Sequence, residues 1–159
     1  MGGAVGSVRL SRLGFNAQQV SVSPDTTCRR IVVPTDFSAC AEQAWVLAQR
    51  LARPLRSELL LIHVVAGDDA WAEAARRWAT DELGDCAGKA RVEGLKVRVA
   101  LRAGVPYREI VAFARDERAD LIVIGIHGHG RINRLLLGSV ADRLLRVAPC
   151  PVLTVRESA

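Results

Sequence analysis

The chain has 159 residues, of which 50% are hydrophobic and 25% are charged. This length and composition suit one globular domain with a substantial core and are too small for two ordinary domains. The net charge of +5 comes with no block of like charges and few aromatic residues, so we do not expect a nucleic-acid-binding protein. The apolar runs are far shorter than the roughly 18 residues that cross a bilayer, so we expect no transmembrane helix.

Residues 1–28 differ in composition from the rest of the chain. They are rich in glycine and serine, lack a periodic apolar face and contain no acidic residue before Asp25. We expect a flexible N-terminal extension here, followed by one domain over residues 29–159. An acid-poor, arginine-bearing start also faintly resembles an organelle transit peptide, and that alternative stays open.

The four cysteines, Cys28, Cys40, Cys86 and Cys150, do not form a C-x-x-C pair, and no secretory apolar segment precedes them. This pattern indicates reduced thiols in a cytoplasmic protein rather than a disulfide framework. Cys86 and Cys150 stand among apolar residues and are expected to be small core residues.

Short apolar runs and helical patterns alternate along the chain from Arg29 onward. Residues 29–34 read as a buried strand that ends at Pro34, and Ser38 is placed to cap a helix that runs to about Arg53. Residues 59–65 form a second apolar strand. Asp68 or Asp69 is then placed to cap a long helix that runs to about Val92, and Gly94 stops this helix.

The long helix is expected to turn a broad apolar face inward. The residues on this face are Trp71, Ala75, Trp78, Ala79, Leu83, Cys86 and Ala90. For the two tryptophans, a partner surface is the alternative to core packing.

The second half of the chain continues the alternation. Residues 95–101 alternate apolar and charged side chains, which predicts a half-exposed or edge strand. A helix from Pro106 to about Glu117, a strand over 121–124, a helix over 139–147 and a strand over 151–155 complete the pattern.

This order of elements predicts a parallel α/β sheet with helices on both faces. Right-handed crossovers leave few topologies for it, and ligands bind such sheets beyond the carboxyl ends of the strands, where the strand order reverses. If strands 29–34 and 121–124 flank that point, the run Pro34-Thr35-Asp36 and the loop after residue 124 face one crevice.

The loop after residue 124 is rich in glycine. It reads G-x-x-G, nine residues, then G-S, through Gly125, Gly128, Gly138 and Ser139. Glycine lets a ligand approach the backbone closely, and the helix that opens at Ser139 offers N–H groups and a dipole to an anion. Arg131 and Arg134 are placed to screen a polyphosphate. The pattern therefore indicates a phosphate-binding loop.

Other interpretations of the loop are weaker or remain open. No Gly-Lys-Ser/Thr follows it, and it does not open the chain's first strand-helix unit, so neither the P-loop nor the dinucleotide fingerprint applies. A tight strand-helix connection without a ligand stays possible. His127 and His129 lie two apart, but no carboxylate or cysteine accompanies them at metal-ligand spacing. His63, within an apolar strand, is expected to be a hydrogen-bonded core histidine, and Asp36 is alternatively a helix-capping acid.

Four segments together resemble one family, the universal stress proteins, over about residues 29–156. The segments are I-V-V-P-T-D-F-S (31–38), L-L-L-I-H-V-V (59–65), G-I-H-G-H-G-R…L-L-L-G-S-V-A (125–141) and C-P-V-L-T-V-R (150–156). The spacing G-x-x-G-x9-G-S is similar to that of the family's ATP-binding branch.

The resemblance implies a Rossmann-like α/β fold, with a five-stranded parallel sheet of order 3-2-1-4-5, and a nucleotide between the ends of the first and fourth strands. It implies that Asp36 hydrogen-bonds the nucleoside, that Pro34 and Thr35 shape its pocket, and that the backbone of Val64 meets the adenine. The residues expected around the ribose and phosphates are Gly125, His127, Gly128, Gly130, Arg131, Gly138, Ser139 and Val140.

The resemblance also implies ATP, or AMP or ADP, as the ligand, with Mg²⁺ beside a triphosphate, and a homodimer that pairs through Pro151 to Val155. We expect a stress-response regulator. Two alternatives stay open: a slow ATP-hydrolysing enzyme, in which His127 is the only nearby titrating group that can position a water, and a nucleotide-free dimeric scaffold.

Overall fold

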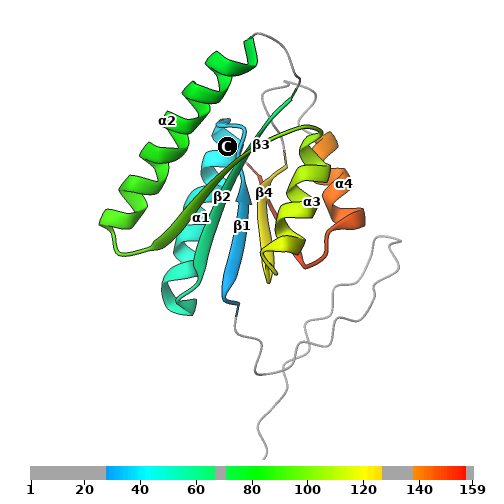
Figure 1. The fold of residues 1–159 in the computed structure, drawn as a ribbon. Coiled ribbons are helices and arrows are strands. Elements are labelled where there is room, and N and C mark those ends of the chain that lie inside the picture. Colours follow the sequence, from blue (N-terminus) through cyan, green and yellow to red (C-terminus); the bar gives the residue numbers. More distant parts are fainter. Residues whose placement is uncertain (1–27, 67–70, 127–137, 157–159) are drawn as a thin grey trace, which may run out of the picture.

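The computed structural model describes residues 28–66, 71–126 and 138–156, in which helices and strands alternate along the chain (Figure 1). The strands are β1 (Arg30–Pro34), β2 (Glu58–Val65), β3 (Lys96–Ala103), β4 (Leu121–Gly125) and β5 (Val152–Val155). The helices are α1 (Ala39–Leu55), α2 (Trp71–Val92), α3 (Pro106–Asp116) and α4 (Ser139–Val147). The expected extension, apart from Cys28, and the expected start of α2 at Asp68 or Asp69 lie outside the described residues.

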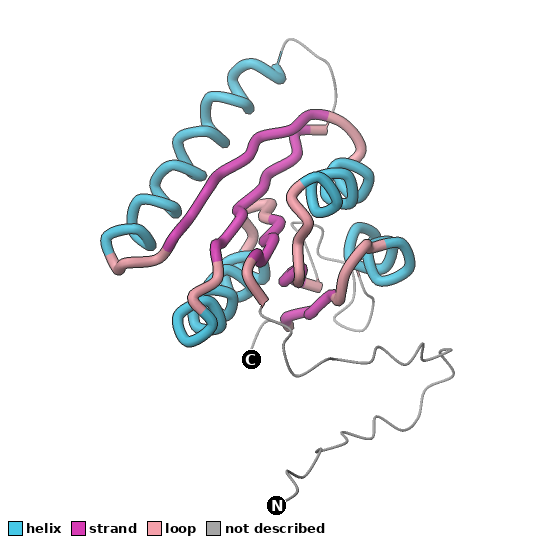
Figure 2. The backbone as a smooth tube through the Cα atoms, turned by 60° about the horizontal axis from the view of Figure 1, so that its bottom comes forward, coloured by secondary structure: helices cyan, strands magenta, loops and turns pink. Residues whose placement is uncertain are grey.

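All strand pairs are parallel, and the strand order is β3-β2-β1-β4-β5, which confirms the prediction. Helices α1 and α2 cover one face of the sheet, and α3 and α4 cover the other (Figure 2). A right-handed crossover puts its helix on a face that depends on the direction of travel across the sheet. The chain moves outward from β1 to β3 and then returns to β4, so the helices change face and the strand order reverses between β1 and β4.

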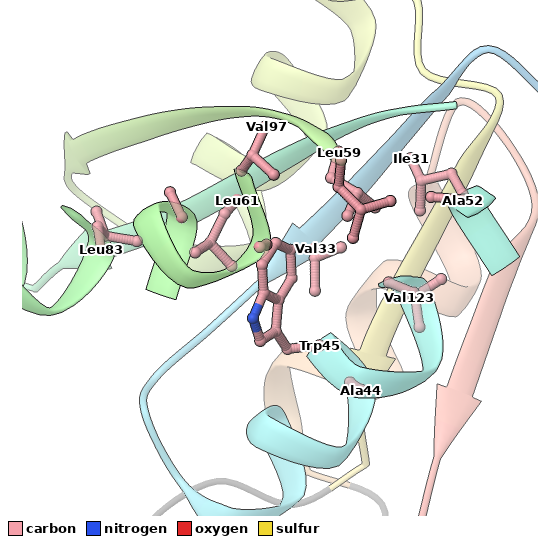
Figure 3. Close-up of a cluster of buried hydrophobic side chains, with 14 residues drawn as sticks. Ile31, Val33, Ala44, Trp45, Ala52, Leu59, Leu61, Leu83, Val97 and Val123 are labelled. Atoms are coloured by element: carbon pink, nitrogen blue, oxygen red, sulfur yellow. The ribbon is translucent and has the colours of Figure 1, made fainter. Parts of the chain in front are cut away.

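The core consists of two apolar layers that the sheet separates. Successive strand residues point to opposite faces, so Ile31 and Val33 belong to the layer under α1 and α2, and Val32 belongs to the layer under α3 and α4. Trp45 of α1 packs against the first layer, close to Val33 and Leu61 (Figure 3). Because both faces are covered, the central strands read as continuous apolar runs.

Helix α1 begins as predicted and ends slightly later than predicted. The Ser38 side chain accepts a hydrogen bond from the Ala41 N–H, which confirms the expected N-cap. The helix continues beyond Arg53 through Pro54 to Leu55. It stops where Arg56 adopts a left-handed conformation and its N–H bonds to carbonyls of the last turn.

Two predictions about buried side chains of α2 were wrong. Ala75 is exposed and Trp78 is 51% exposed. Helix α2 packs against the edge strand β3 and its neighbour β2, so only a narrow stripe of the helix faces the sheet. The buried residues of that stripe are Ala79, Leu83, Ala87 and Ala90.

Cys86 and Cys150, expected in the core, are only partly buried at the margins of the two apolar layers. The described residues include no helix with the length and apolar character that a membrane crossing requires.

Candidate functional site

The backbone directly after β1 is held by hydrogen bonds to β2. The Thr35 N–H donates to the carbonyl of Ile62 at 2.9 Å. His63 donates from Nδ1 to the carbonyl of Thr35 at 2.8 Å, and a carbonyl can only accept, so Nδ1 carries the proton. His63 is therefore hydrogen-bonded, as expected, although it is half-buried rather than fully in the core.

A tight turn follows, in which two side chains bond to the backbone two residues ahead. Thr35 Oγ1 accepts from the Phe37 N–H at 2.9 Å, and Asp36 Oδ1 accepts from the Ser38 N–H at 3.1 Å. Phe37, at the centre of the turn, has a φ of 61°. Asp36 thus belongs to a turn just before α1, and the helix cap is Ser38.

Phe37 is not among the predicted site residues. Its ring lies 4.8 Å from the ring of His63 and 4.9 Å from that of Trp78, measured between centroids. The sequence gives no sign of its positive φ, because glycine, asparagine and aspartate are the residues that commonly adopt the left-handed backbone conformation, and phenylalanine is not one of them.

The start of α4 lies at the carboxyl end of β4. The Gly138 N–H donates to the carbonyl of Ile126 at 2.7 Å, and the Ile126 N–H donates to the carbonyl of Val155 at 2.9 Å. The N-cap residue of α4 is Gly138, so no side-chain oxygen caps the first turn. A helix start of this kind has backbone N–H groups without intrahelical partners and a partial positive charge, which together attract anions.

Gly125 is required by the packing of α1. A Cβ atom on Gly125 would lie 2.8 Å from both the carbonyl carbon and the carbonyl oxygen of Cys40, and 3.0 Å from the N of Ala41. The first turn of α1 therefore approaches β4 so closely that a side chain does not fit. This contact accounts for the glycine without any ligand.

The fold brings the described part of the predicted site to one edge of the sheet. Strands β1 and β4 are neighbours, and β2 pairs with β1 on its other side, so the carboxyl ends of all three strands lie together. The predicted site residues at this edge are Pro34, Thr35, Asp36, Val64, Gly125, Gly138, Ser139 and Val140. His127, Gly128, Gly130 and Arg131 lie outside the described residues.

A groove of about 580 Å³ lies between α1 and α2. Trp45 and Leu61 line it together with charged side chains of both helices. It reaches the turn after β1 at Thr35 and Phe37, and among the described residues of the predicted site it includes Thr35 alone. In the part of the chain that the structure describes, no three His, Cys, Asp or Glu residues are grouped to hold a metal ion.

The sheet topology, with helices on both faces and a reversal of strand order between β1 and β4, defines a doubly wound α/β protein. The sequence profile of the Universal stress protein family matches residues 27–156, and the chain belongs to this family.

Individual relatives agree with this assignment. The chain is 34% identical over 140 residues to universal stress protein MJ0531 of Methanocaldococcus jannaschii, covering 81% of this chain and 82% of the relative. The solved structure of MJ0577 from the same organism superposes with a TM-score of 0.75 at 27% identity, covering 83% and 98% of the two chains. A universal stress protein from Archaeoglobus fulgidus, solved in complex with dAMP, gives a TM-score of 0.67 at 28% identity and covers 80% and 97%.

Proposed function

We propose that this chain binds an adenine nucleotide at the carboxyl edge of the sheet, between the ends of β1 and β4. The observation that carries the proposal is that the glycine-capped start of α4 and the Thr35–Phe37 turn follow the carboxyl ends of the neighbouring strands β4 and β1, where the strand order reverses. Doubly wound sheets bind ligands at this point, and helix N-termini favour phosphate. The dAMP complex of the Archaeoglobus relative supports an adenine nucleotide as the ligand.

In this proposal each side of the edge binds a different part of the nucleotide. Asp36 hydrogen-bonds the nucleoside, Pro34 and Thr35 shape its pocket, and the backbone of Val64 meets the adenine. The N–H groups of the first turn of α4 and the hydroxyl of Ser139 bind phosphate oxygens. The remaining residues of the proposed site are Gly125, His127, Gly128, Gly130, Arg131, Gly138 and Val140.

The donor groups fit a phosphate-bearing ligand. The Thr35 N–H donates, and its carbonyl and Oγ1 accept, in internal hydrogen bonds that fix the shape this residue gives the pocket. The anion-binding part is then backbone N–H at the start of α4, where no side-chain oxygen competes. We propose ATP as the main ligand, with AMP or ADP as alternatives, and Mg²⁺ to neutralise the charge of a triphosphate.

We further propose that the protein is a cytoplasmic stress-response regulator that acts as a homodimer. Within the described residues β5 pairs with β4 alone, so its other edge is open. Leu153 on this strand is 38% exposed. An open apolar edge strand is suited to pair with a second copy through Pro151 to Val155.

The test is direct measurement of bound nucleotide. Protein purified without added nucleotide is denatured, and the supernatant is separated by ion exchange; the stripped protein is then titrated with Mg-ATP by calorimetry. Co-purified adenine nucleotide or micromolar affinity is the expected result. ADP that accumulates on standing would favour the ATP-hydrolysing enzyme, and the absence of both nucleotide and heat would favour the nucleotide-free scaffold.

Asp36→Ala tests the role of the turn. Because Asp36 is assigned to the nucleoside, we expect adenosine affinity to fall by about tenfold or more, the effect of losing one hydrogen bond to a charged group. Affinity for inorganic tripolyphosphate should stay the same. Asp81→Ala, which removes an exposed carboxylate of α2, is the control and should change neither. An equal loss for both ligands would contradict the assignment.

A further inference from the structure

We infer that Phe37 and Trp78 are positioning residues of the adenosine site, because their contact holds the turn that presents Asp36. Trp78 belongs to α2, a helix to which the proposed function assigns no nucleotide contact. The inference rests on the proposed function. It adds that adenosine affinity depends on a side chain outside the nucleotide-binding segments.

The first observation is the backbone of Phe37. Its φ of 61° lies in the left-handed region, which is unfavourable for a bulky side chain. Arg56 and Arg118 also have positive φ, but each follows the last turn of a helix, where this conformation is an ordinary ending. Phe37 instead stands between β1 and α1, so its surroundings must hold it in this conformation.

The second observation is that the Phe37 ring joins two elements to the turn. His63 of β2 contacts the ring at 4.8 Å and also donates to the Thr35 carbonyl, so one histidine supports both the backbone and the ring. Trp78 of α2 meets the ring edge-on, at 4.9 Å and 72°. Edge-to-face contacts of this kind are favourable beyond simple burial.

The third observation is the space around the ring. Phe37 and Thr35 also line the groove between α1 and α2, so these two helices do not close over the ring on that side. Trp78 is itself 51% exposed and does not belong to either apolar layer of the core. Its contact with Phe37 therefore lies outside the core, beside the turn.

The link from the ring to the site is short. Phe37 follows Asp36 directly, and the Phe37 N–H and the Asp36 carboxylate both bond within the same turn. If Trp78 is removed, Phe37 can relax toward negative φ, and the peptide that joins it to Asp36 then rotates. The carboxylate samples other directions and binds adenosine less often in the correct geometry.

The experiment measures adenosine and tripolyphosphate binding to the full chain by calorimetry. Trp78→Ala should weaken adenosine binding by about threefold to tenfold and leave tripolyphosphate binding unchanged, because α2 and α4 cover opposite faces of the sheet. Trp78→Phe keeps an aromatic ring and should restore most of the affinity. Val92→Ala, which truncates an 89%-exposed residue of the same helix, is the matched control and should change neither affinity.

The outcomes separate this inference from the proposed function. Wild-type protein that binds adenosine while Trp78→Ala binds it equally well overturns the inference alone. Equal losses for adenosine and tripolyphosphate, or no rescue by Trp78→Phe, also overturn it, since they indicate a general structural defect. Wild-type protein that binds ATP but not adenosine also overturns the inference alone, whereas wild-type protein that binds neither overturns both. If Trp78→Ala fails to fold, as judged by circular dichroism, Trp78→Leu answers the same question.

Discussion

Gly125→Ala is the substitution with the clearest expected effect on stability. The added Cβ would lie 2.8 Å from two backbone atoms of Cys40, whereas ordinary contacts begin at 3.4 Å. Strand β4 and the start of α1 must therefore separate by about 0.6 Å, the difference between those two distances. Backbone atoms cannot rotate away as a flexible side chain can, so the strain is shared by both elements.

The magnitude follows from two opposing effects. Over-packing a core costs about 1–3 kcal/mol, and replacing glycine by alanine stabilises by about 0.4–1 kcal/mol through the unfolded chain. We expect Gly125→Ala to lower the free energy of unfolding by about 1–2 kcal/mol. In urea unfolding followed by circular dichroism, this loss should appear as a lower midpoint urea concentration, with an unchanged dependence of the free energy of unfolding on urea concentration.

Gly84→Ala is the matched control. Gly84 lies inside α2, and an added Cβ would meet nothing within 4 Å. Alanine should therefore stabilise the helix by about 0.5–1 kcal/mol, the opposite sign from position 125. A Gly125→Ala protein as stable as wild type would refute the packing argument. If that protein had also lost nucleotide affinity, the glycine would serve the ligand.

Three further predictions concern the described residues. Ser38→Ala should lower the free energy of unfolding by about 1 kcal/mol through loss of the helix cap, and an unchanged urea midpoint would contradict this. Burial raises the pKa of the Cys150 thiol from 9.0 to about 11, so iodoacetamide at pH 8 should label it far more slowly in the folded than in the urea-unfolded chain. Because the pKa of the Cys150 thiol is raised in the folded state, its contribution to stability is fully present below about pH 9 and is lost as the pH rises toward 11. The free energy of unfolding of the wild type should therefore fall over this pH range more than that of Cys150→Ala. The hydrogen bond from Arg98 lowers the pKa of the Glu117 carboxyl in the folded state. The contribution of Glu117 to the free energy of unfolding is therefore present above its ordinary pKa of 4.5 and is lost as the pH falls below it. Glu117→Gln should therefore reduce the loss of stability in acid, and urea midpoints measured as the pH falls check this.

The sequence predicted the elements well because their signals are local. Pro34 ends β1, Ser38 caps α1 and Gly94, with a φ of 83°, follows α2. Continuous apolar runs indicated the buried strands, and the alternation of apolar and charged residues indicated that β3 is an edge strand of the sheet. The strand order came instead from the resemblance to universal stress proteins, since alternation alone permits more than one order.

Tertiary structure decided what depends on the approach of distant segments. The sequence shows a glycine at position 125 but not the reason for it. Only the position of α1 shows that the backbone of Cys40 occupies the space that a Cβ atom at this position would need. Periodicity placed Trp78 inward, yet the narrow contact of α2 with the sheet leaves this residue half exposed and in contact with Phe37. Helical spacing says which side chains share a face. How wide a strip of that face is buried depends on the neighbouring elements, which are distant in the sequence and carry no local signal.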